Sequence, residues 1–313
     1  MNAPRRSLPP AEDRAVGCLI GLAIGDALGT TLEFTTRDTY EPVTDVVGGG
    51  PFNLNAGEWT DDTSMALCLA DSLVECRGLD PADLMERFRR WRDEGYNSVN
   101  GRCFDIGIAT RAAIDRYVST GDPLAGATAA NSAGNGCIMR LAPVPIFYAT
   151  DVVAAEAAAV LQSRTTHGAT ECLDSCRLMT RVLVALLNGQ PWQQAIDVDP
   201  APFSAARVKA IAGGSWREKE RAAIKSSGYV IDTLEAALWA VHTTQDFAGA
   251  VLLAVNLGGD ADTVGAVTGQ LAGARYGASG IPAAWCRTLA WHDRIVALAQ
   301  ALMRDPAPDA GRA

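Results

Sequence analysis

Residues 17–29, GCLIGLAIGDALG, decide the fold, because they place a glycine at every fourth position of an otherwise apolar segment. An α-helix turns once in about 3.6 residues, so the glycines at 17, 21, 25 and 29 form a stripe along one face of a helix over residues 11–29. A face without side chains lets a second helix approach closely. The spacing differs from the GxGxxG of dinucleotide-binding proteins.

The rest of the chain continues this helical periodicity. Asp80 and Pro81, a capping residue and a proline at the first helical position, predict a helix to about residue 93. Further helices are expected at roughly 104–119, 151–163, 169–188, 231–242, 246–256, 262–276 and 283–302. Strand-like alternation is absent, and glycine-rich loops occupy residues 46–59 and 131–136. The sequence therefore predicts a single all-α domain at 10–303, with polar tails at 1–9 and 304–313.

The composition is that of a globular protein, since 48% of the 313 residues are hydrophobic and 20% are charged. The net charge of −9 argues against nucleic-acid binding, which needs a concentrated basic surface. Eight cysteines without a CxxC pair, and three histidines without zinc-site spacing, predict reduced thiols. The apolar run at 15–24 is too short to span a bilayer and follows acidic residues, so we expect a cytoplasmic protein.

Two stretches each place acidic residues at a helix start. GEWTDDTSM (57–65) and LGGDADT (257–263) both lead from glycine through aspartates and threonine into an apolar helix. Each also fits a plain helix start, because Thr60 can be an N-cap and first-turn aspartates suit the helix dipole. If the stretches converge, their four carboxylates require divalent cations, and all-oxygen ligands favour Mg²⁺. The spacing alone leaves both interpretations open.

These stretches fail two known metal motifs and fit a third. An EF-hand starting at Asp260 needs an acid where Leu271 stands, and an isoprenoid-synthase DDxxD starting at Asp61 needs one at Met65. Haloacid-dehalogenase-type phosphatases carry DxDxT or DxDxV, and residues 260–264 fit the second form, but that motif belongs after a buried strand early in an α/β domain. A phosphatase is therefore the second enzyme candidate.

The chain resembles the ADP-ribosylglycohydrolase family through motifs that occur in a fixed order. They are GLAIGDALG (21–29), GPF and GEWTDDTSMAL (50–67), FDIG (104–107), SAGNGCIMRLAP (132–143), TTHG (165–168), SGYVIDTLEAALW (227–239) and NLGGDADTVGAVTGQLAGARYG (256–277). The resemblance covers nearly the whole domain. It implies an orthogonal helical bundle and a binuclear metal cleft, with two Mg²⁺, or Mn²⁺ in their place, beside ADP-ribose.

The resemblance also implies roles for particular residues. The implied metal ligands are Thr60, Asp61, Asp62, Asp260, Asp262 and Thr263. The implied substrate-binding residues are Ser132, Gly134, Asn135 and Gly136 for the diphosphate and ribose, His167 near the phosphates, and Tyr229 against adenine. The candidates for proton transfer are Glu33, Asp61 and Asp105, the last within the FDIG pattern of arginine-directed members. Without the resemblance, His167 and Tyr229 also fit purely structural roles.

By this resemblance, the expected reaction is hydrolytic removal of ADP-ribose from an arginine of a modified protein. The alternatives are a serine or nucleic-acid base linkage, the phosphatase, and a non-catalytic ADP-ribose binder. Expected partners are an ADP-ribosylated protein and the ADP-ribose product, without nucleic acid or membrane, and a monomer is expected. A nitrogenase regulator, an immunity protein against an ADP-ribosylating toxin and a general de-modifying enzyme would share these motifs, so the target stays open.

Overall fold

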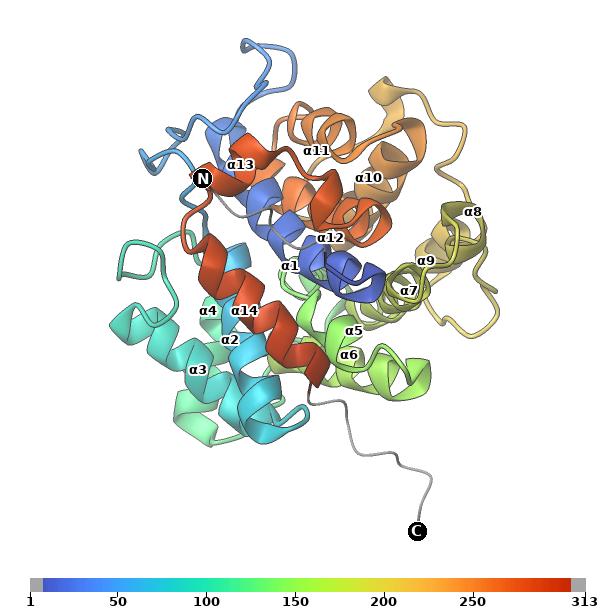
Figure 1. Cartoon of the computed structure of the whole chain (residues 1–313). Coiled ribbons are helices and arrows are strands. Elements are labelled where there is room, and N and C mark those ends of the chain that lie inside the picture. Colours follow the sequence, from blue (N-terminus) through green and yellow to red (C-terminus); the bar gives the residue numbers. More distant parts are fainter. Residues whose placement is uncertain (1–7, 305–313) are drawn as a thin grey trace.

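The computed structural model describes residues 8–304, in which the regular elements are helices (Figure 1). The α-helices are Pro10–Gly29 (α1), Asp61–Cys76 (α2), Pro81–Glu94 (α3), Ile108–Thr120 (α4), Pro143–Phe147 (α5), Val152–Thr166 (α6), Thr170–Leu187 (α7), Trp192–Ala195 (α8), Ala206–Ala212 (α9), Val230–Thr243 (α10), Phe247–Val255 (α11), Ala261–Tyr276 (α12), Ala283–Thr288 (α13) and His292–Arg304 (α14). Within the described residues there is no strand, only isolated β-bridges. The predicted all-α class is confirmed.

Helices α1 and α12 lie against each other in the middle of the bundle, backbone to backbone (Figure 1). A Cβ atom added at Gly21 would lie 2.2 Å from the carbonyl oxygen of Gly269, and one added at Gly25 would lie 2.0 Å from that of Gly265. The predicted glycine stripe is confirmed. Its partner is a second stripe on α12, which Gly273 continues.

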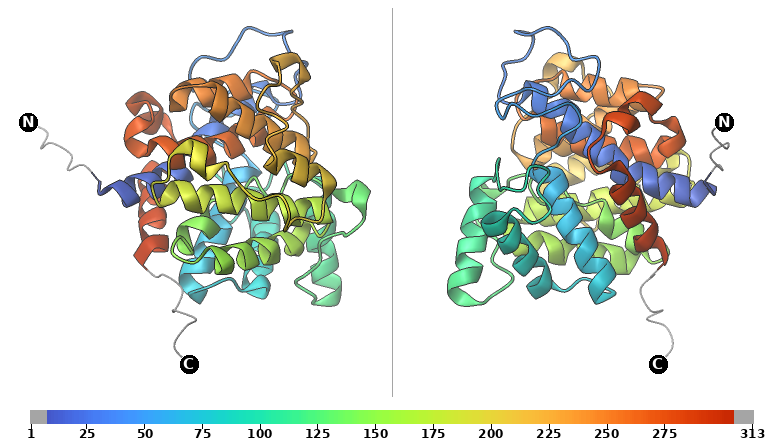
Figure 2. Two further views of the ribbon diagram at one scale, coloured as in Figure 1. Left: turned by 90° about the vertical axis from the view of Figure 1, so that its right-hand side faces the viewer. Right: turned by 60° about the vertical axis from the view of Figure 1, so that its left-hand side comes forward.

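The contact between these two glycine stripes, which we call the glycine seam, brings together two segments that carry predicted site residues. A Cβ atom at Gly29, the last residue of α1, would lie 2.4 Å from the Cα atom of Asp262 in the first turn of α12. The chain leaves α1 through a short 3₁₀ turn, Thr30–Leu32, and continues into a loop that stands out from the helical body (Figure 2). That loop begins with Glu33 and ends at Thr60, so both of its ends lie where α1 meets α12.

By length and composition, the segment Pro10–Leu32 could cross a membrane, since an 18-residue window within it has a mean hydropathy of 1.7. The observed helix is thus longer than the apolar run at 15–24 considered from the sequence. However, 94% of that window is buried inside the structure, and α12 and α14 pack against this helix. Its apolar character is therefore accounted for by its position in the core.

The predicted helix at 283–302 is wrong, because α13 ends at Thr288 and α14 begins at His292. Trp291 between them has a φ of 57°, and its ring packs edge-on against Trp59 at a centroid distance of 5.2 Å. The amide of Ala290 donates a hydrogen bond to the carbonyl of Gly57 at 2.9 Å. These contacts with the loop before α2 hold the break in place.

Two smaller differences have simple causes. The helix expected from residue 104 starts at Ile108, because FDIG forms a turn in which Asp105 has a φ of 57°. Helices α5, α8 and α9 were absent from the sequence-based prediction; they span only 5, 4 and 7 residues, too few to show a helical period. Residues 1–7 and 305–313 of the predicted tails lie outside the described residues, and the domain bounds of 10–303 stay a prediction.

Candidate active site

Asp26, in the glycine helix α1, organises the start of α2. Its buried carboxylate accepts hydrogen bonds from the backbone N–H and hydroxyl of Thr60, both at 2.9 Å. It also accepts from the N–H and hydroxyl of Thr63, at 3.0 and 2.6 Å. Thr60 occupies the predicted N-cap position of α2, but its hydroxyl binds Asp26 and makes no cap bond. The sequence analysis missed Asp26, although a single acid within the apolar stretch 15–29 signals a buried polar partner.

The two acidic helix starts converge in the structure. The Thr60 hydroxyl lies 3.4 Å from Oδ2 of Asp62 and 3.3 Å from Oδ2 of Asp262. The Thr263 hydroxyl lies 3.5 Å from the same Oδ2 of Asp62. Four of the six side chains predicted to bind metal therefore form one group of oxygens, contributed by the N-terminal ends of α2 and α12. All four are buried.

A second acidic group adjoins the first and shares Asp262 with it. Glu33, Asp105 and Asp262 each contribute a carboxylate oxygen, and these oxygens lie within 4.8 Å of one another. The loops that carry Glu33 and Asp105 also touch through the rings of Phe52 and Phe104, whose centroids are 5.3 Å apart. The sequence analysis assigned Glu33 and Asp105 to proton transfer, and the structure places both beside the predicted ligands.

Burial makes the charged form of these acids unfavourable. Burial raises the pKa of Asp61, Asp62 and Asp262 well above the usual range, and neighbouring carboxylates raise it further. Burial, together with the charge of Asp105, raises the pKa of Glu33 to about 9. Burial likewise raises the pKa of Asp105 to about 7. Ionisation of the whole cluster near neutral pH thus requires a compensating positive charge.

The chemistry of the cluster fits a divalent cation. Oδ1 of Asp62 and Oε2 of Glu33 are buried and have no hydrogen-bond partner within the structure. Buried carboxylate oxygens normally have one, so these two mark oxygens available to a ligand. Carboxylates and hydroxyls are the donors that hard ions such as Mg²⁺ and Mn²⁺ prefer. The three acids whose carboxylate oxygens all lie within 4.8 Å of one another are Glu33, Asp105 and Asp262, and of these only Asp262 was predicted to bind metal.

The loop at 131–136 contacts the acidic site through Asn135. The side-chain amide of this buried residue donates to Oδ2 of Asp260 at 2.7 Å and to the Thr233 hydroxyl at 2.9 Å. Asn135 was predicted to bind the diphosphate or ribose, whereas here its amide holds Asp260. The Ser132 hydroxyl donates to the carbonyl of Ala129 at 2.6 Å, so it closes its own turn.

The imidazole of His167 packs against this loop. The side chain is buried, and a Cβ atom added at Gly136 would lie 2.7 Å from Cε1 of the imidazole. A second contact joins Nδ1 to the Thr166 hydroxyl at 2.8 Å. Burial lowers the pKa of His167 to about 4, so the ring is neutral at neutral pH. The neutral ring therefore packs against the loop and adds no charge to it.

Tyr229 lies beside a cavity of about 520 Å³ between α4 and the loop at 131–136. Ser132, Gly134 and Tyr229, all predicted to bind substrate, line this cavity, as does Ile108 of α4. The Tyr229 hydroxyl donates to Glu171 and accepts a hydrogen bond from Arg207 at 3.1 Å, which fixes the ring at the cavity wall. The cavity adjoins the acidic cluster, because a Cβ atom at its wall residue Gly228 would lie 3.5 Å from Oδ2 of Asp260.

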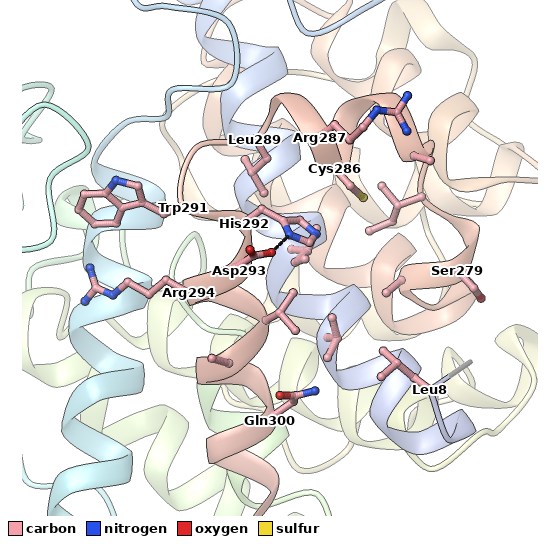
Figure 3. Close-up of a pocket in the computed structure, with 17 residues that line it drawn as sticks. Leu8, Ser279, Cys286, Arg287, Leu289, Trp291, His292, Asp293, Arg294 and Gln300 are labelled. Carbon is pink, nitrogen blue, oxygen red and sulfur yellow. Dashed lines mark hydrogen bonds and ion pairs between the residues drawn. The ribbon is translucent and has the colours of Figure 1, made fainter. Parts of the chain in front are cut away.

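A larger cavity, of about 1230 Å³, lies apart from the predicted site, between α1, α13 and α14 (Figure 3). Its wall includes Trp291, Arg294 and His292, whose Nδ1 lies 2.9 Å from Oδ1 of Asp293. None of the predicted site residues lines it. Cavity size therefore does not identify the functional site of this protein.

Comparison with known proteins agrees with this geometry. The ADP-ribosylglycohydrolase family model matches residues 7–310. The chain is 49% identical over 304 residues to ADP-ribosylarginine hydrolase Tri1 of Serratia proteamaculans, covering 96% of this chain and 82% of that protein. It is 34% identical over 285 residues to the ADP-ribosyl-[dinitrogen reductase] glycohydrolase of Rhodospirillum rubrum, covering 90% and 92%.

A solved structure described as an ADP-ribosylglycohydrolase-related protein complex is also similar. It is 43% identical to this chain, with a TM-score of 0.86, and the similarity covers 95% of this chain and 99% of the other. Sequence motifs, helical architecture and converging acids thus agree with the family match. This chain belongs to the ADP-ribosylglycohydrolase family.

Proposed function

We propose that this protein hydrolyses the bond between ADP-ribose and an arginine guanidinium nitrogen of a modified protein, with the help of divalent cations. The observation that supports it most is the meeting of Glu33, Asp105 and Asp262 within 4.8 Å, beside the Thr60–Asp62 helix start. The naming of a relative at 49% identity as an ADP-ribosylarginine hydrolase supports the arginine linkage.

The proposed cofactors are two Mg²⁺ ions, with Mn²⁺ as a substitute. Bound there, such ions would orient ribose hydroxyls and water and would stabilise charge as the bond breaks. The residues that would hold them are Thr60, Asp61, Asp62, Asp260, Asp262 and Thr263. Asp26 positions this set by holding the start of α2, and Asn135 positions it by holding Asp260.

Carboxylates beside these metal-binding residues would carry out the proton transfers. Hydrolysis needs a base that takes a proton from the attacking water and an acid that gives one to the departing guanidine nitrogen. Glu33, Asp61 and Asp105 are the candidates, and Glu33 and Asp105 approach Asp262 from two different loops. Assistance of this kind is typically worth about 10²- to 10⁴-fold in rate.

Two alternatives have less support. A haloacid-dehalogenase-type phosphatase needs its first aspartate after a buried strand, whereas Asp260 is at the N-cap of α12 and residues 8–304 contain no strand. A non-catalytic ADP-ribose binder has no need for buried acids whose charged forms are unfavourable. Hydrolysis of a serine or nucleic-acid base linkage uses the same cleft, and the choice among linkages is part of the test.

The deciding experiment is a panel of ADP-ribosyl conjugates of arginine, serine, glutamate and a nucleic-acid base, incubated with the protein in Mg²⁺ or in a chelator. We expect release of ADP-ribose from the arginine conjugate in Mg²⁺ only. Asp262→Asn is expected to abolish this release. Asp197→Asn, at an exposed acid, serves as the matched control and is expected to keep it. Absence of release from every conjugate would refute the proposal.

We further propose a monomeric cytoplasmic protein that binds neither nucleic acid nor membrane. The support is the net charge of −9 and the burial in the core of α1, the one helix among residues 8–304 that is long and apolar enough to cross a membrane. Size-exclusion chromatography with light scattering tests the monomer. Cell fractionation tests the location.

A further inference from the structure

Phe34 is an aromatic residue that the fold leaves uncovered. Its side chain is 70% exposed, which makes it the most exposed phenylalanine or tryptophan among residues 8–304. Its backbone has a φ of 60°, in the left-handed region that bulky residues rarely adopt. Neither burial nor local conformation favours phenylalanine at this position. Residues held in such an unfavourable backbone conformation are often found at functional sites.

The turn that carries Phe34 is held rigidly. The Phe34 amide donates to the carbonyl of Gly259 at 2.7 Å, and the Gly259 amide donates back to the carbonyl of Thr35 at 2.8 Å. This pair of bonds ties the turn to the residue before Asp260. Arg37 ties it from the other side through three hydrogen bonds from its guanidinium group, at 3.0, 3.0 and 2.7 Å, to the carbonyls of Leu257, Arg221 and Ile224. The ring is thus presented to solvent by a preorganised backbone.

The position of Phe34 relative to the acids suggests what covers it. Its neighbour Glu33 is buried and faces Asp105 and Asp262, whereas Phe34 is exposed. At the start of α4, Ile108 stands three residues after Asp105 and is 90% exposed. A substrate whose scissile bond lies among the acids must leave its protein part outside the cleft. That part therefore passes the exposed side chains next to the two acidic loops.

We propose that Phe34 is a docking contact for the protein part of the substrate and takes an apolar side chain next to the ADP-ribosylated residue. This inference rests on the proposed function. An apolar occupant fits because the exposed ring is itself apolar, and because the acids beside it disfavour an acidic surface. A rigid, exposed aromatic side chain is also the usual form of an interface anchor, since little conformational freedom is lost on binding.

The test compares two substrates that share the scissile bond, an arginine-ADP-ribosylated protein and free ADP-ribosyl-arginine. The variant is Phe34→Asn, because asparagine adopts the left-handed backbone more readily than phenylalanine. The matched control is Val153→Asn, which replaces another exposed apolar side chain, 74% exposed at the start of α6. The measured quantities are kcat, KM and melting temperature.

For Phe34→Asn we expect KM for the modified protein to rise about tenfold while kcat is unchanged. We expect KM for free ADP-ribosyl-arginine to change less than about twofold, and the melting temperature to equal or exceed that of the wild type. Val153→Asn should match the wild type on both substrates. An unchanged KM for the protein would overturn the proposal, and so would equal losses on both substrates, because Phe34 would then shape the acidic site itself.

The two proposals fail separately. If the wild type cleaves neither substrate, the proposed hydrolysis is refuted. Equilibrium binding of the ADP-ribosylated protein to the wild type and to Phe34→Asn then tests docking alone. A weaker Kd in the variant supports the docking contact, and an equal Kd overturns it.

Discussion

Replacing a glycine in the seam between α1 and α12 tests two physical effects, helix propensity and packing, because they change the free energy of unfolding in opposite directions. Gly269 lies inside α12, and its replacement by alanine ought to favour the helix by about 1 kcal/mol from intrinsic propensity alone. In the structure, however, the added Cβ atom would lie 1.9 Å from the carbonyl oxygen of Gly21. Helix propensity predicts stabilisation, and packing predicts destabilisation.

The packing effect is expected to dominate. Ordinary contacts begin at 3.4 Å, so the two backbones must separate by about 1.5 Å at this point. Overpacking of this kind costs about 1–3 kcal/mol, and the upper end applies because the opposing atom is backbone that no side-chain rotation can move. After subtraction of the propensity gain, we expect Gly269→Ala to lower the free energy of unfolding by about 2 kcal/mol. For a chain of 313 residues, this corresponds to a fall in Tm of about 3 °C.

The measurement is thermal and urea denaturation followed by far-ultraviolet circular dichroism. Gly213→Ala is the matched control, because Gly213 is exposed and an added Cβ there would lie at ordinary distances of 3.4 and 3.5 Å from its neighbours. We expect the control to stay within about 0.5 kcal/mol of the wild type. A Gly269→Ala protein as stable as the wild type, or more stable, would refute the close packing of α1 and α12.

Three further predictions concern the site. Asp26→Asn should lower the free energy of unfolding by about 1–3 kcal/mol and reduce ADP-ribose release, because an amide cannot accept all four hydrogen bonds from Thr60 and Thr63; denaturation and activity assays check this. Chelation should lower the wild-type Tm and Mg²⁺ should restore it, since ligand at about 100 times its Kd stabilises by about 2.7 kcal/mol; Asp62→Asn should respond weakly to both in a thermal shift assay. His167, whose pKa burial lowers from 6.5 to about 4, should stabilise the fold fully above pH 6.5 and lose that contribution as the pH falls toward 4. Urea denaturation of the wild type and His167→Gln over this range should show a steeper loss in the wild type, and parallel profiles would contradict the assignment.

Much of the fold follows from periodicity in the sequence, because long amphipathic or apolar segments have one dominant way to pack. The helix at 169–188 was predicted within a residue of α7, and the glycine stripe of α1 does mark a close helix contact. Periodicity could not show that the partner of α1 is α12, nor that the helix at 283–302 breaks at Trp291. Both depend on contacts between segments far apart in sequence, Gly21 with Gly269 in one case and Trp59 with Trp291 in the other.

The candidate site, like the fold, could be predicted only in part from the sequence. The sequence identified the acids of two helix starts, but their approach required the resemblance to a family, because about 200 residues separate them and no local rule fixes that distance. The sequence analysis missed Asp26, since a carboxylate that accepts four hydrogen bonds inside the core looks, in the sequence, like one charge in the apolar stretch 15–29. Asp26 lies in the glycine seam and holds the start of α2, while Asp262 lies at the other side of that seam. The close packing of α1 and α12 therefore also sets the distance between the two halves of the acidic site. A change of about 1 Å in that distance is enough to lower the rate about 10²-fold.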